Sequence, residues 1–377
     1  MSADAPARSR REGVGAPVSP PDTAAPAVPG SRRAVAGIAA LTVLSVALVM
    51  ATVALGSVAL PAGEVVRALA GGDVPDATAT IVGQVRLPRA VTALIAGAAL
   101  GLGGLQMQTL FRNPLADPYI LGISAGASLG VALVVLAGGS TGIAVASGVG
   151  LAGGAGIAAA AATGATAVTL LVLAASRRVE SPATVLIIGL MVGYAVTAIV
   201  SVLVQGGFGQ LERVRAFVAW GFGSFAGTSW TDITLLATVA AVGLVLAAAT
   251  MKALNAVLLG DAYAASMGVR VRRVRIIVVI SASLLAGVVT AFCGPIAFIG
   301  VASPHLARGL LRSSDHRVLL PATLLVGAAV ALAAGLIAQL PGQDATLPLN
   351  SVTALVGAPV VVTVLLRLRR SSRAVVT

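Results

Sequence analysis

The chain of 377 residues is strongly apolar, with 58% hydrophobic and only 10% charged residues. Its mean hydropathy is +1.00. Water-soluble domains carry about 25% charged residues, so this composition indicates a polytopic membrane protein. One cysteine, Cys293, and two histidines exclude a disulfide scaffold and a four-ligand zinc or iron–sulfur site. The net charge of +12 comes from basic residues between apolar runs, which indicates membrane orientation rather than nucleic-acid binding.

The chain begins with a polar segment. Residues 1–33 are rich in Pro, Ala, Ser and Arg without apolar periodicity, which predicts a disordered cytoplasmic tail. The apolar run that follows is too long for the core of a cleaved signal peptide, so we expect an uncleaved first span. The predicted division is therefore a tail at 1–33 and one membrane domain at 34–377.

Apolar segments long enough to cross the ~30 Å hydrocarbon core as helices recur along the membrane domain. We expect about ten, near 34–60, 90–110, 123–138, 146–175, 184–205, 231–250, 274–292, 295–308, 319–340 and 351–366. The segments at 123–138 and 295–308 are short enough to be broken or partly re-entrant. The predicted fold class is an all-α polytopic membrane protein.

The basic residues orient these spans. With ten spans, only Arg67, Arg86, Arg89, Arg213 and Arg215 fall on one side of the membrane, and all other Lys and Arg residues fall on the opposite side. Lys and Arg accumulate in cytoplasmic loops. Both termini are therefore predicted to be cytoplasmic.

The polar residues bear on the energy source. All acidic residues fall in predicted loops or at span ends, so we expect no Asp or Glu in the membrane interior. This disfavours an ion-coupled transporter, although backbone carbonyls can also bind sodium. The one lysine, Lys252, lies between Met251 and Ala253, so the chain has no phosphate-binding P-loop.

A short serine motif also needs weighing. Residues Gly122–Gly126 match the G-x-S-x-G pattern of a hydrolase nucleophile elbow. The two histidines, His305 and His316, are predicted at the cytoplasmic surface, out of reach of that serine. Small residues at this spacing are typical of closely packed membrane helices. We therefore expect helix packing here and reject an intramembrane hydrolase.

Two arginines open the second span on the external side. Arg86-Leu87-Pro88-Arg89 places them one helical turn apart around a proline suited to a helix start. The pair could present positive charge to an external partner. The alternative is that both side chains snorkel to the membrane interface.

Three cytoplasmic or broken stretches follow. Pro114 and Pro118 break the chain after the second span. In the loop 254–268, Leu259, Tyr263 and Met267 recur at four-residue spacing and predict a short helix with an exposed apolar stripe. The stripe fits either a soluble partner or the lipid surface. The segment Gly294–Arg308 is interrupted at Pro295 and Pro304.

Together these stretches resemble the iron-siderophore/cobalamin (FecCD-like) permease family of ABC importers. The residues that carry the resemblance are GAALGLGGLQMQTLFRNPLADPYILGISAGASLG (97–130), RLPR (86–89), GPIAFIGVASPHLAR (294–308), SDHR (314–317) and VTALVGAP (352–359). The resemblance runs from about Ala34 to the C-terminus.

The resemblance implies a type II importer permease in the bacterial inner membrane that pairs with a second permease subunit as a homodimer or heterodimer. Two cytosolic ATPase subunits and an extracytoplasmic substrate-binding protein complete such an importer. ATP-Mg is then bound by the ATPase, and this chain, which is not an enzyme, is expected to hold no cofactor and no metal.

Site residues follow from the same resemblance. Arg86 and Arg89 match binding-protein contacts. Asn113, Leu115 and Ser181 match a cytoplasmic gate. The positions that match the loop contacting the ATPase are Leu259, Gly260, Asp261, Ala264 and Gly268, with Asp261 where the family usually has Glu.

The last external loop departs from the family pattern. Gly335 and Gln339 stand where relatives often have Asp and Arg, and Asn350 replaces a Gly and can still take a left-handed backbone there. A heterodimer whose partner keeps the charges would explain the loss. The implied function is import of an intact metal chelate, with a ferric siderophore favoured and cobalamin or haem as the alternative.

Overall fold

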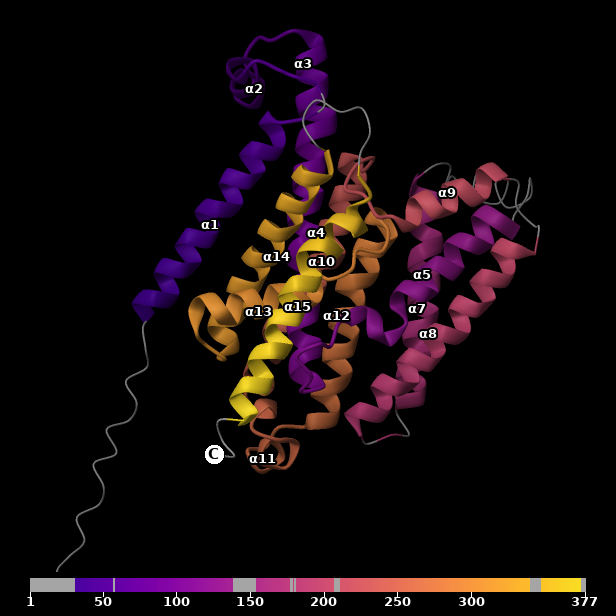
Figure 1. Ribbon diagram of the computed structural model, residues 1–377, viewed down its shortest axis with the longest axis vertical. Helices are drawn as coiled ribbons and strands as arrows, with labels where there is room; N and C mark the ends of the chain where they lie inside the picture. The colour runs from indigo at the N-terminus through magenta and orange to yellow at the C-terminus, as the bar shows by residue number, and fades with distance from the viewer. Residues whose placement is uncertain are drawn as a thin grey trace, which may run out of the picture.

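Figure 1 gives the arrangement of helices in the computed structural model, which describes residues 31–56, 58–137, 154–176, 179, 181–206, 211–339 and 347–373. All regular elements in these ranges are helical. In chain order they are α1 (Ser31–Ala54), α2 (Ala62–Leu69), α3 (Asp76–Thr80), the π-helix η1 (Ile81–Arg86), α4 (Leu87–Leu110), the 3₁₀ turn η2 (Pro118–Leu121), α5 (Ile123–Ala132), the π-helix η3 (Leu133–Ala137), α7 (Gly154–Ser176), α8 (Pro182–Gln205), α9 (Leu211–Gly221), α10 (Trp230–Leu258), α11 (Asp261–Ser266), α12 (Val271–Cys293), α13 (Ile299–Leu311), α14 (His316–Gln339) and α15 (Leu349–Arg373).

Seven helices in the described ranges are long and apolar enough to cross a membrane. One of them is the continuous helix Asp76–Leu110, formed by α3, η1 and α4, and the other six are α1, α7, α8, α10, α12 and α14. Shorter apolar stretches, Ile123–Leu136 and Leu349–Thr363, occupy two further predicted spans. Helix α13, with 13 residues, occupies the predicted span at 295–308. The prediction of an all-helical polytopic membrane protein is confirmed, and the two segments expected to be broken are indeed short.

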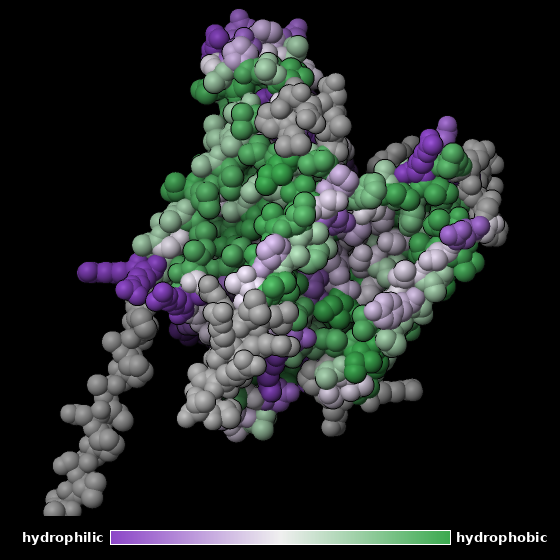
Figure 2. All heavy atoms as spheres, in the orientation of Figure 1, coloured by the Kyte–Doolittle hydropathy of each residue, from purple (hydrophilic) through white to green (hydrophobic). Residues whose placement is uncertain are grey.

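The surface follows the polarity expected of a membrane protein. Figure 2 shows hydrophobic side chains over the middle of one face, with hydrophilic residues at α2–α3 and at the start of α1. Along α1 the exposed hydrophobic residues include Val35, Val43, Leu44, Val46 and Met50. This belt is the surface that lipid solvates.

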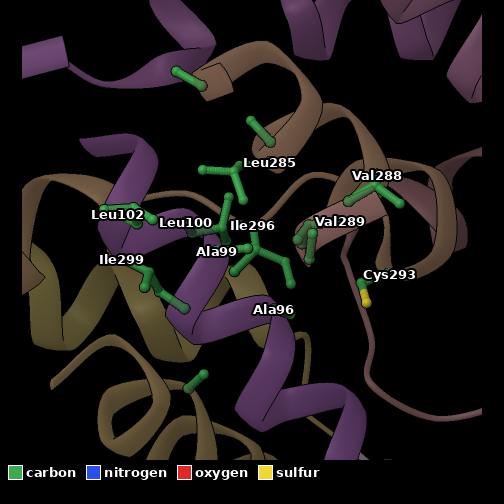
Figure 3. Packing of buried hydrophobic residues seen from close by; sticks show 14 of the residues in the cluster. Ala96, Ala99, Leu100, Leu102, Leu285, Val288, Val289, Cys293, Ile296 and Ile299 are labelled. Carbon is green, nitrogen blue, oxygen red and sulfur yellow. The ribbon is translucent and has the colours of Figure 1, made fainter. Parts of the chain in front are cut away.

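Helix α4 forms the centre of the bundle. Every residue from Ala99 to Leu110 is buried, and α10, α12, α13 and α14 all pack against α4. Glycines permit this closeness, because a Cβ at Gly97 would overlap the carbonyl oxygen of Gly327, and one at Gly104 would overlap that of Gly300. Figure 3 shows the packing of Ala96, Ala99, Leu100 and Leu102 against Leu285, Val288, Val289, Cys293, Ile296 and Ile299.

The G-x-S-x-G stretch packs as expected. A Cβ at Gly126 would lie 2.5 Å from the carbonyl oxygen of Gly164, and one at Gly130 would overlap the carbonyl oxygen of Ala160. These contacts join α5 to α7 with their backbones nearly touching. The prediction of helix packing is confirmed for these glycines.

The ends of the first two long helices differ from expectation. Helix α1 begins at Ser31, inside the predicted tail, and ends at Ala54 rather than at Leu60. The second helical stretch begins at Asp76, before the expected residue 90. Its π-helix η1 immediately precedes Pro88, whose missing N–H cannot continue regular α-helical pairing. The remaining predicted tail, 1–30, lies outside the described residues.

The connection between α4 and α5 turns back into the protein. A Cβ at Gly103 would lie 3.0 Å from Cγ of Pro118, and one at Gly300 would lie 2.6 Å from Oδ2 of Asp117. Gly103 precedes the end of α4 at Leu110 by about 10 Å of helix. Asp117 therefore packs among the helices although it belongs to a connection, as all acidic residues were expected to. The sequence could not reveal this, since it marks the helix break but not the direction of the chain afterwards.

Candidate functional site

Arg86 lies at the end of the bundle that the charge pattern predicts to be external, called the external end below, where it contacts helix α1. Its guanidinium donates hydrogen bonds to the carbonyl oxygens of Val53 at 3.0 Å, Ala54 at 2.8 Å and Val58. The last carbonyls of a helix lack partners within the helix, and a cation there also complements the helix dipole. Only 4% of Arg86 is exposed. In this chain the charge of Arg86 is therefore directed at the end of α1, and its match to a binding-protein contact stays a prediction.

Arg89, one turn further, is half-buried and lines an external cavity of about 290 Å³. The same cavity is lined by Gly335 and Gln339, the two positions that depart from the family pattern, and by Phe225 and Leu347. The structure thus brings Arg89 together with both departures, although they are more than 200 residues apart in the sequence. Of the two predicted docking arginines, Arg89 is the one whose side chain borders an open space.

Asn350 does not use the left-handed backbone that an asparagine can take. The left-handed non-glycine residues in the described ranges are Arg112, Phe298 and Arg312. Asn350 lies in the first turn of α15, where its side chain accepts from the N–H of Ala297 at 2.9 Å. It also donates to the carbonyl oxygens of Pro295 at 2.7 Å and Gly221 at 3.1 Å. The amide holds the broken segment before α13, which no glycine could do.

At the opposite end, which is predicted to be cytoplasmic and is called the cytoplasmic end below, α11 lies between α10 and α12 in the chain and protrudes from the bundle (Figure 1). We call Leu259–Gly268 the α11 segment. Leu259, Tyr263 and Met267 are 66%, 54% and 49% exposed, so the predicted apolar stripe is present. Glycines bound the helix because Gly260 and Gly268 have φ of 120° and 83°, which residues with a Cβ rarely adopt. Ala264, on the opposite side, is fully buried against α10 and α12 residues.

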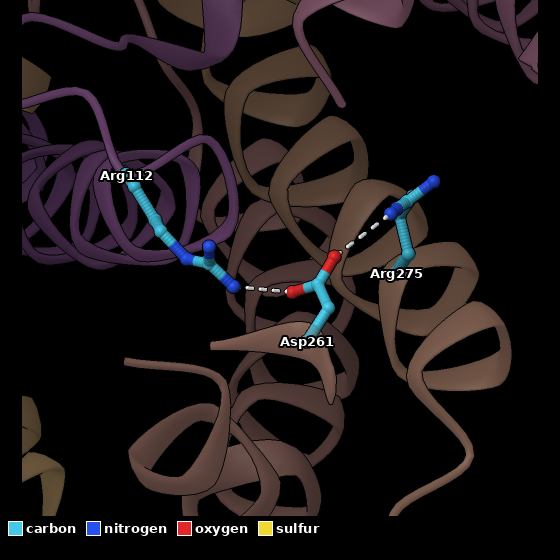
Figure 4. A network of polar contacts seen from close by, with 3 residues as sticks. All are labelled: Arg112, Asp261 and Arg275. Carbon is cyan, nitrogen blue, oxygen red and sulfur yellow. Dashed lines mark hydrogen bonds and ion pairs between the residues drawn. The ribbon is translucent and has the colours of Figure 1, made fainter. Parts of the chain in front are cut away.

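Asp261 opens α11 and joins three elements. Its Oδ1 lies 2.5 Å from a terminal nitrogen of Arg112, which follows α4, and its Oδ2 lies 3.5 Å from Arg275 of α12. Figure 4 shows the carboxylate between the two guanidinium groups. The position that matched the family's acidic residue thus forms ion pairs within the chain itself.

The predicted gate residues Asn113 and Leu115 lie in the turn Phe111–Ala116, which we call the α4–α5 turn. The side-chain Oδ1 of Asn113 accepts a hydrogen bond from the N–H of Leu115 at 3.0 Å, and the main-chain carbonyl oxygen of Asn113 accepts one from the N–H of Ala116 at 3.0 Å. These bonds fix the turn locally. His305 of α13 also hydrogen-bonds the carbonyl oxygen of Pro114 at 2.7 Å, a contact that the sequence motif contained but did not explain.

Ser181, the third predicted gate residue, lies apart at the start of α8 and is exposed. A cytoplasmic cavity of about 610 Å³ lies between its neighbourhood and the α11 segment. Phe111 lines it from the α4–α5 turn, Val179 and Val185 from either side of Ser181, and Asp261 from α11. Chain neighbours of the predicted gate positions thus line this cavity, although Asn113, Leu115 and Ser181 themselves do not. Of the two segments, the α4–α5 turn is the one ion-paired to α11, through Arg112.

A second polar network at this end was missed by the sequence analysis. Asn255, near the end of α10, donates to Asp315 at 2.6 Å and accepts from Nδ1 of His316 at 2.7 Å. The ring's Nε2 contacts the hydroxyl of Thr109 in α4 at 2.9 Å. Burial acts to raise the pKa of Asp315, but hydrogen bonds from the Arg317 N–H and from Asn255 hold that pKa below its usual value. The motif SDHR thus ties α10 and α14 to α4.

Known proteins resemble the chain over most of its length. The vitamin B12 import system permease protein BtuC of Klebsiella pneumoniae subsp. pneumoniae is 36% identical over 286 residues, covering 76% of this chain and 82% of that protein. BtuC of Salmonella paratyphi A is 35% identical over 334 residues, covering 87% of this chain and 94% of that protein. A solved inward-facing structure of a metal-chelate type ABC transporter has a TM-score of 0.72 and 28% identity, covering 88% of this chain and 98% of that one.

Fold and similarities together define a multi-pass membrane permease of a bacterial ABC importer, which is a transport subunit and not an enzyme. The family model of the FecCD transport family matches residues 43–367. The chain therefore belongs to the FecCD transport family, and the resemblance found in its motifs is confirmed.

Proposed function

We propose that the chain is the membrane-spanning subunit of an importer that carries an intact metal chelate, with a ferric siderophore as the first candidate. The chain supplies few soft ligands, with two histidines and one cysteine, so the metal would cross inside its organic complex. Cobalamin is the second candidate because the relatives compared above are named as vitamin B12 permeases. Haem remains a third.

The proposed architecture has ten spans with both termini in the cytoplasm, which adds α5, α13 and α15 to the seven long apolar helices. A second permease subunit, identical or not, would form the pathway together with this chain. Two cytosolic ATPase subunits would bind ATP-Mg, and an extracytoplasmic binding protein would deliver the chelate.

One observation carries the ATPase contact: the α11 segment exposes Leu259, Tyr263 and Met267 beyond the cytoplasmic end of the bundle. An exposed apolar stripe flanked by polar chain is typical of a protein-docking surface. Gly260 and Gly268 hold the segment away from the bundle by their positive φ. In the proposed role, this surface receives the movement of the ATPase.

Reconstitution tests the proposal. The chain is inserted into liposomes with its ATPase and binding protein, and uptake of radiolabelled ferric siderophore is compared with uptake of radiolabelled cobalamin and haem. Uptake of one chelate that requires ATP and all components supports the proposal. Tyr263→Asp should prevent ATPase association without affecting assembly of the membrane subunit. Uptake of free metal ion, or uptake without ATP, would contradict the proposal.

A further inference from the structure

Two connected ion pairs distinguish the α4–α5 turn from other parts of the cytoplasmic surface. One carboxylate, Asp261, uses both of its oxygens, one toward Arg112 and the other toward Arg275. Because Arg112 belongs to the α4–α5 turn and Arg275 to α12, the carboxylate at the start of α11 links that turn to a long helix (Figure 4). A movement of α11 would therefore displace Asp261 and, with it, the guanidinium of Arg112, the residue next to Asn113.

The Arg112–Asp261 pair contributes little to the stability of the fold. The side chains of Arg112 and Asp261 are 46% and 40% exposed. Exposed ion pairs typically stabilise a protein by about 0–1 kcal/mol. The last turn of α4 is held independently by its buried residues and by the hydrogen bond between Thr109 and His316. This ion pair can thus form and break while the bundle stays intact.

The turn beyond Arg112 is arranged to move as a unit. Arg112 has a left-handed backbone, with φ of 47°, which an arginine adopts only under constraint from its surroundings. Asn113 and Leu115 are joined by a side-chain hydrogen bond one residue later. A displacement of the Arg112 side chain is therefore transmitted to both predicted gate residues together.

The opposite wall of the cytoplasmic cavity differs in construction. Val179 and Val185, on either side of Ser181, line the same cavity of about 610 Å³ as Asp261 and Ala265. These two valines are apolar and form no ion pair with α11. The ion pair at Arg112 is thus the direct contact between α11 and a segment that carries predicted gate residues.

We propose that the Arg112–Asp261–Arg275 ion pairs transmit movement of the α11 segment to the α4–α5 turn, so that Arg112 is a positioning residue for gating. This inference rests on the function proposed above, in which α11 meets the ATPase. Without Arg112, the ATPase still docks and hydrolyses ATP, but the turn carrying Asn113 and Leu115 no longer follows it.

The test uses the complete importer in liposomes and a maleimide probe, which needs no knowledge of the cargo. Leu115→Cys is introduced as the reporter; the native Cys293 is buried and stays unlabelled. The modification rate of the reporter should change when ATP is added. Arg112→Gln should reduce that ATP-dependent change, and uptake per ATP hydrolysed, about tenfold, a typical size for coupling between sites. The ATPase rate should stay unchanged.

Three variants serve as controls. Arg112→Lys keeps the charge and should restore most of the response. Arg273→Gln removes one charge from an exposed position on α12 that is not part of the Arg112–Asp261–Arg275 ion pairs, and it should have no effect. Asp261→Asn combined with Arg112→Gln should cost no more than the larger single change, because residues that act through each other are not additive.

The outcomes separate this inference from the proposed function. If Tyr263→Asp leaves the ATPase bound and uptake normal, α11 is not the docking segment and both ideas fail. If Tyr263→Asp prevents docking but Arg112→Gln retains the ATP-dependent labelling and uptake of the unmodified chain, the ion-pair proposal alone is overturned. Full additivity of the two charge removals would also contradict it.

Discussion

Helix α4 has an arginine beyond each of its ends, and the two arginines do different work. Arg86, before the helix, is buried and donates three hydrogen bonds to backbone carbonyls at the end of α1. Arg112, after the helix, is half exposed and pairs with the carboxylate of Asp261. Burial and the type of acceptor therefore decide whether an arginine stabilises the fold, as at Arg86, or can respond to a partner, as we propose for Arg112.

The largest expected effect is at Arg86. Arg86→Gln removes charged hydrogen bonds, each contributing about 1.5–3 kcal/mol, and leaves buried carbonyls unpaired. We expect a free energy of unfolding lower by about 3 kcal/mol or more, seen as a lower melting temperature in detergent and faster proteolysis. Arg112→Gln should leave both measurements unchanged. Equal stability of the two variants would remove the contrast between the two ends of α4.

Arg89 sharpens the comparison at the external end. Arg89→Glu reverses the charge beside the cavity with Gly335 and Gln339. If Arg89 faces acidic residues of a binding protein, affinity should fall by about 2–5 kcal/mol, and the remaining affinity should lose its dependence on salt. Binding of the isolated partner to reconstituted importer at several salt concentrations measures this. Pairing the change with Arg86→Glu would be uninformative, because that variant should unfold.

Gly260 tests the cytoplasmic end without altering any charge. Gly260 has a φ of 120°, a value that the ring of proline forbids and that strains the backbone of alanine. A Cβ at this position would meet no atom within 4 Å, so a substitution acts through the backbone alone. Gly260→Pro should abolish uptake. Gly260→Ala should cost about 1–2 kcal/mol locally and reduce uptake partially. Gly63→Ala, in open space in helix α2, is the matched control. An unaffected Gly260→Pro importer would show that the α11 conformation is irrelevant to coupling.

The smallest expected effect concerns Asp315 and pH. The folded-state pKa of Asp315 is lowered from its ordinary value of 3.8, so its contribution to stability is present above that pH and is lost as the pH falls through the lowered pKa. Since the side chain is exposed, the change should be a few tenths of a kcal/mol. The N–H of Arg317 donates to Asp315, so its protection against hydrogen exchange, measured relative to the intrinsic rate at each pH, should fall on acidification. In Asp315→Asn that acid dependence should be absent.

The sequence alone determined the helical membrane class, the exposed stripe of α11 and the close packing of Gly126 and Gly130. These features depend on hydrophobicity and local spacing, which the order of residues expresses directly. It also identified the family, because several motifs occur in the family's order. The residues around Asp261 were marked as important on the same ground, but without any indication of what they contact.

Only the tertiary structure decided the direction and partners of the polar side chains. The sequence predicted the same docking role for Arg86 and Arg89. In the structure, Arg86 is buried against the carbonyls of Val53 and Ala54, which are over 30 residues away in the chain, whereas Arg89 lies beside a cavity. It likewise could not show that the chain after Pro114 turns inward and carries Asp117 into the bundle. Hydrophobic periodicity reports which face of a helix is buried, whereas the acceptor that a charge finds depends on segments brought together by folding.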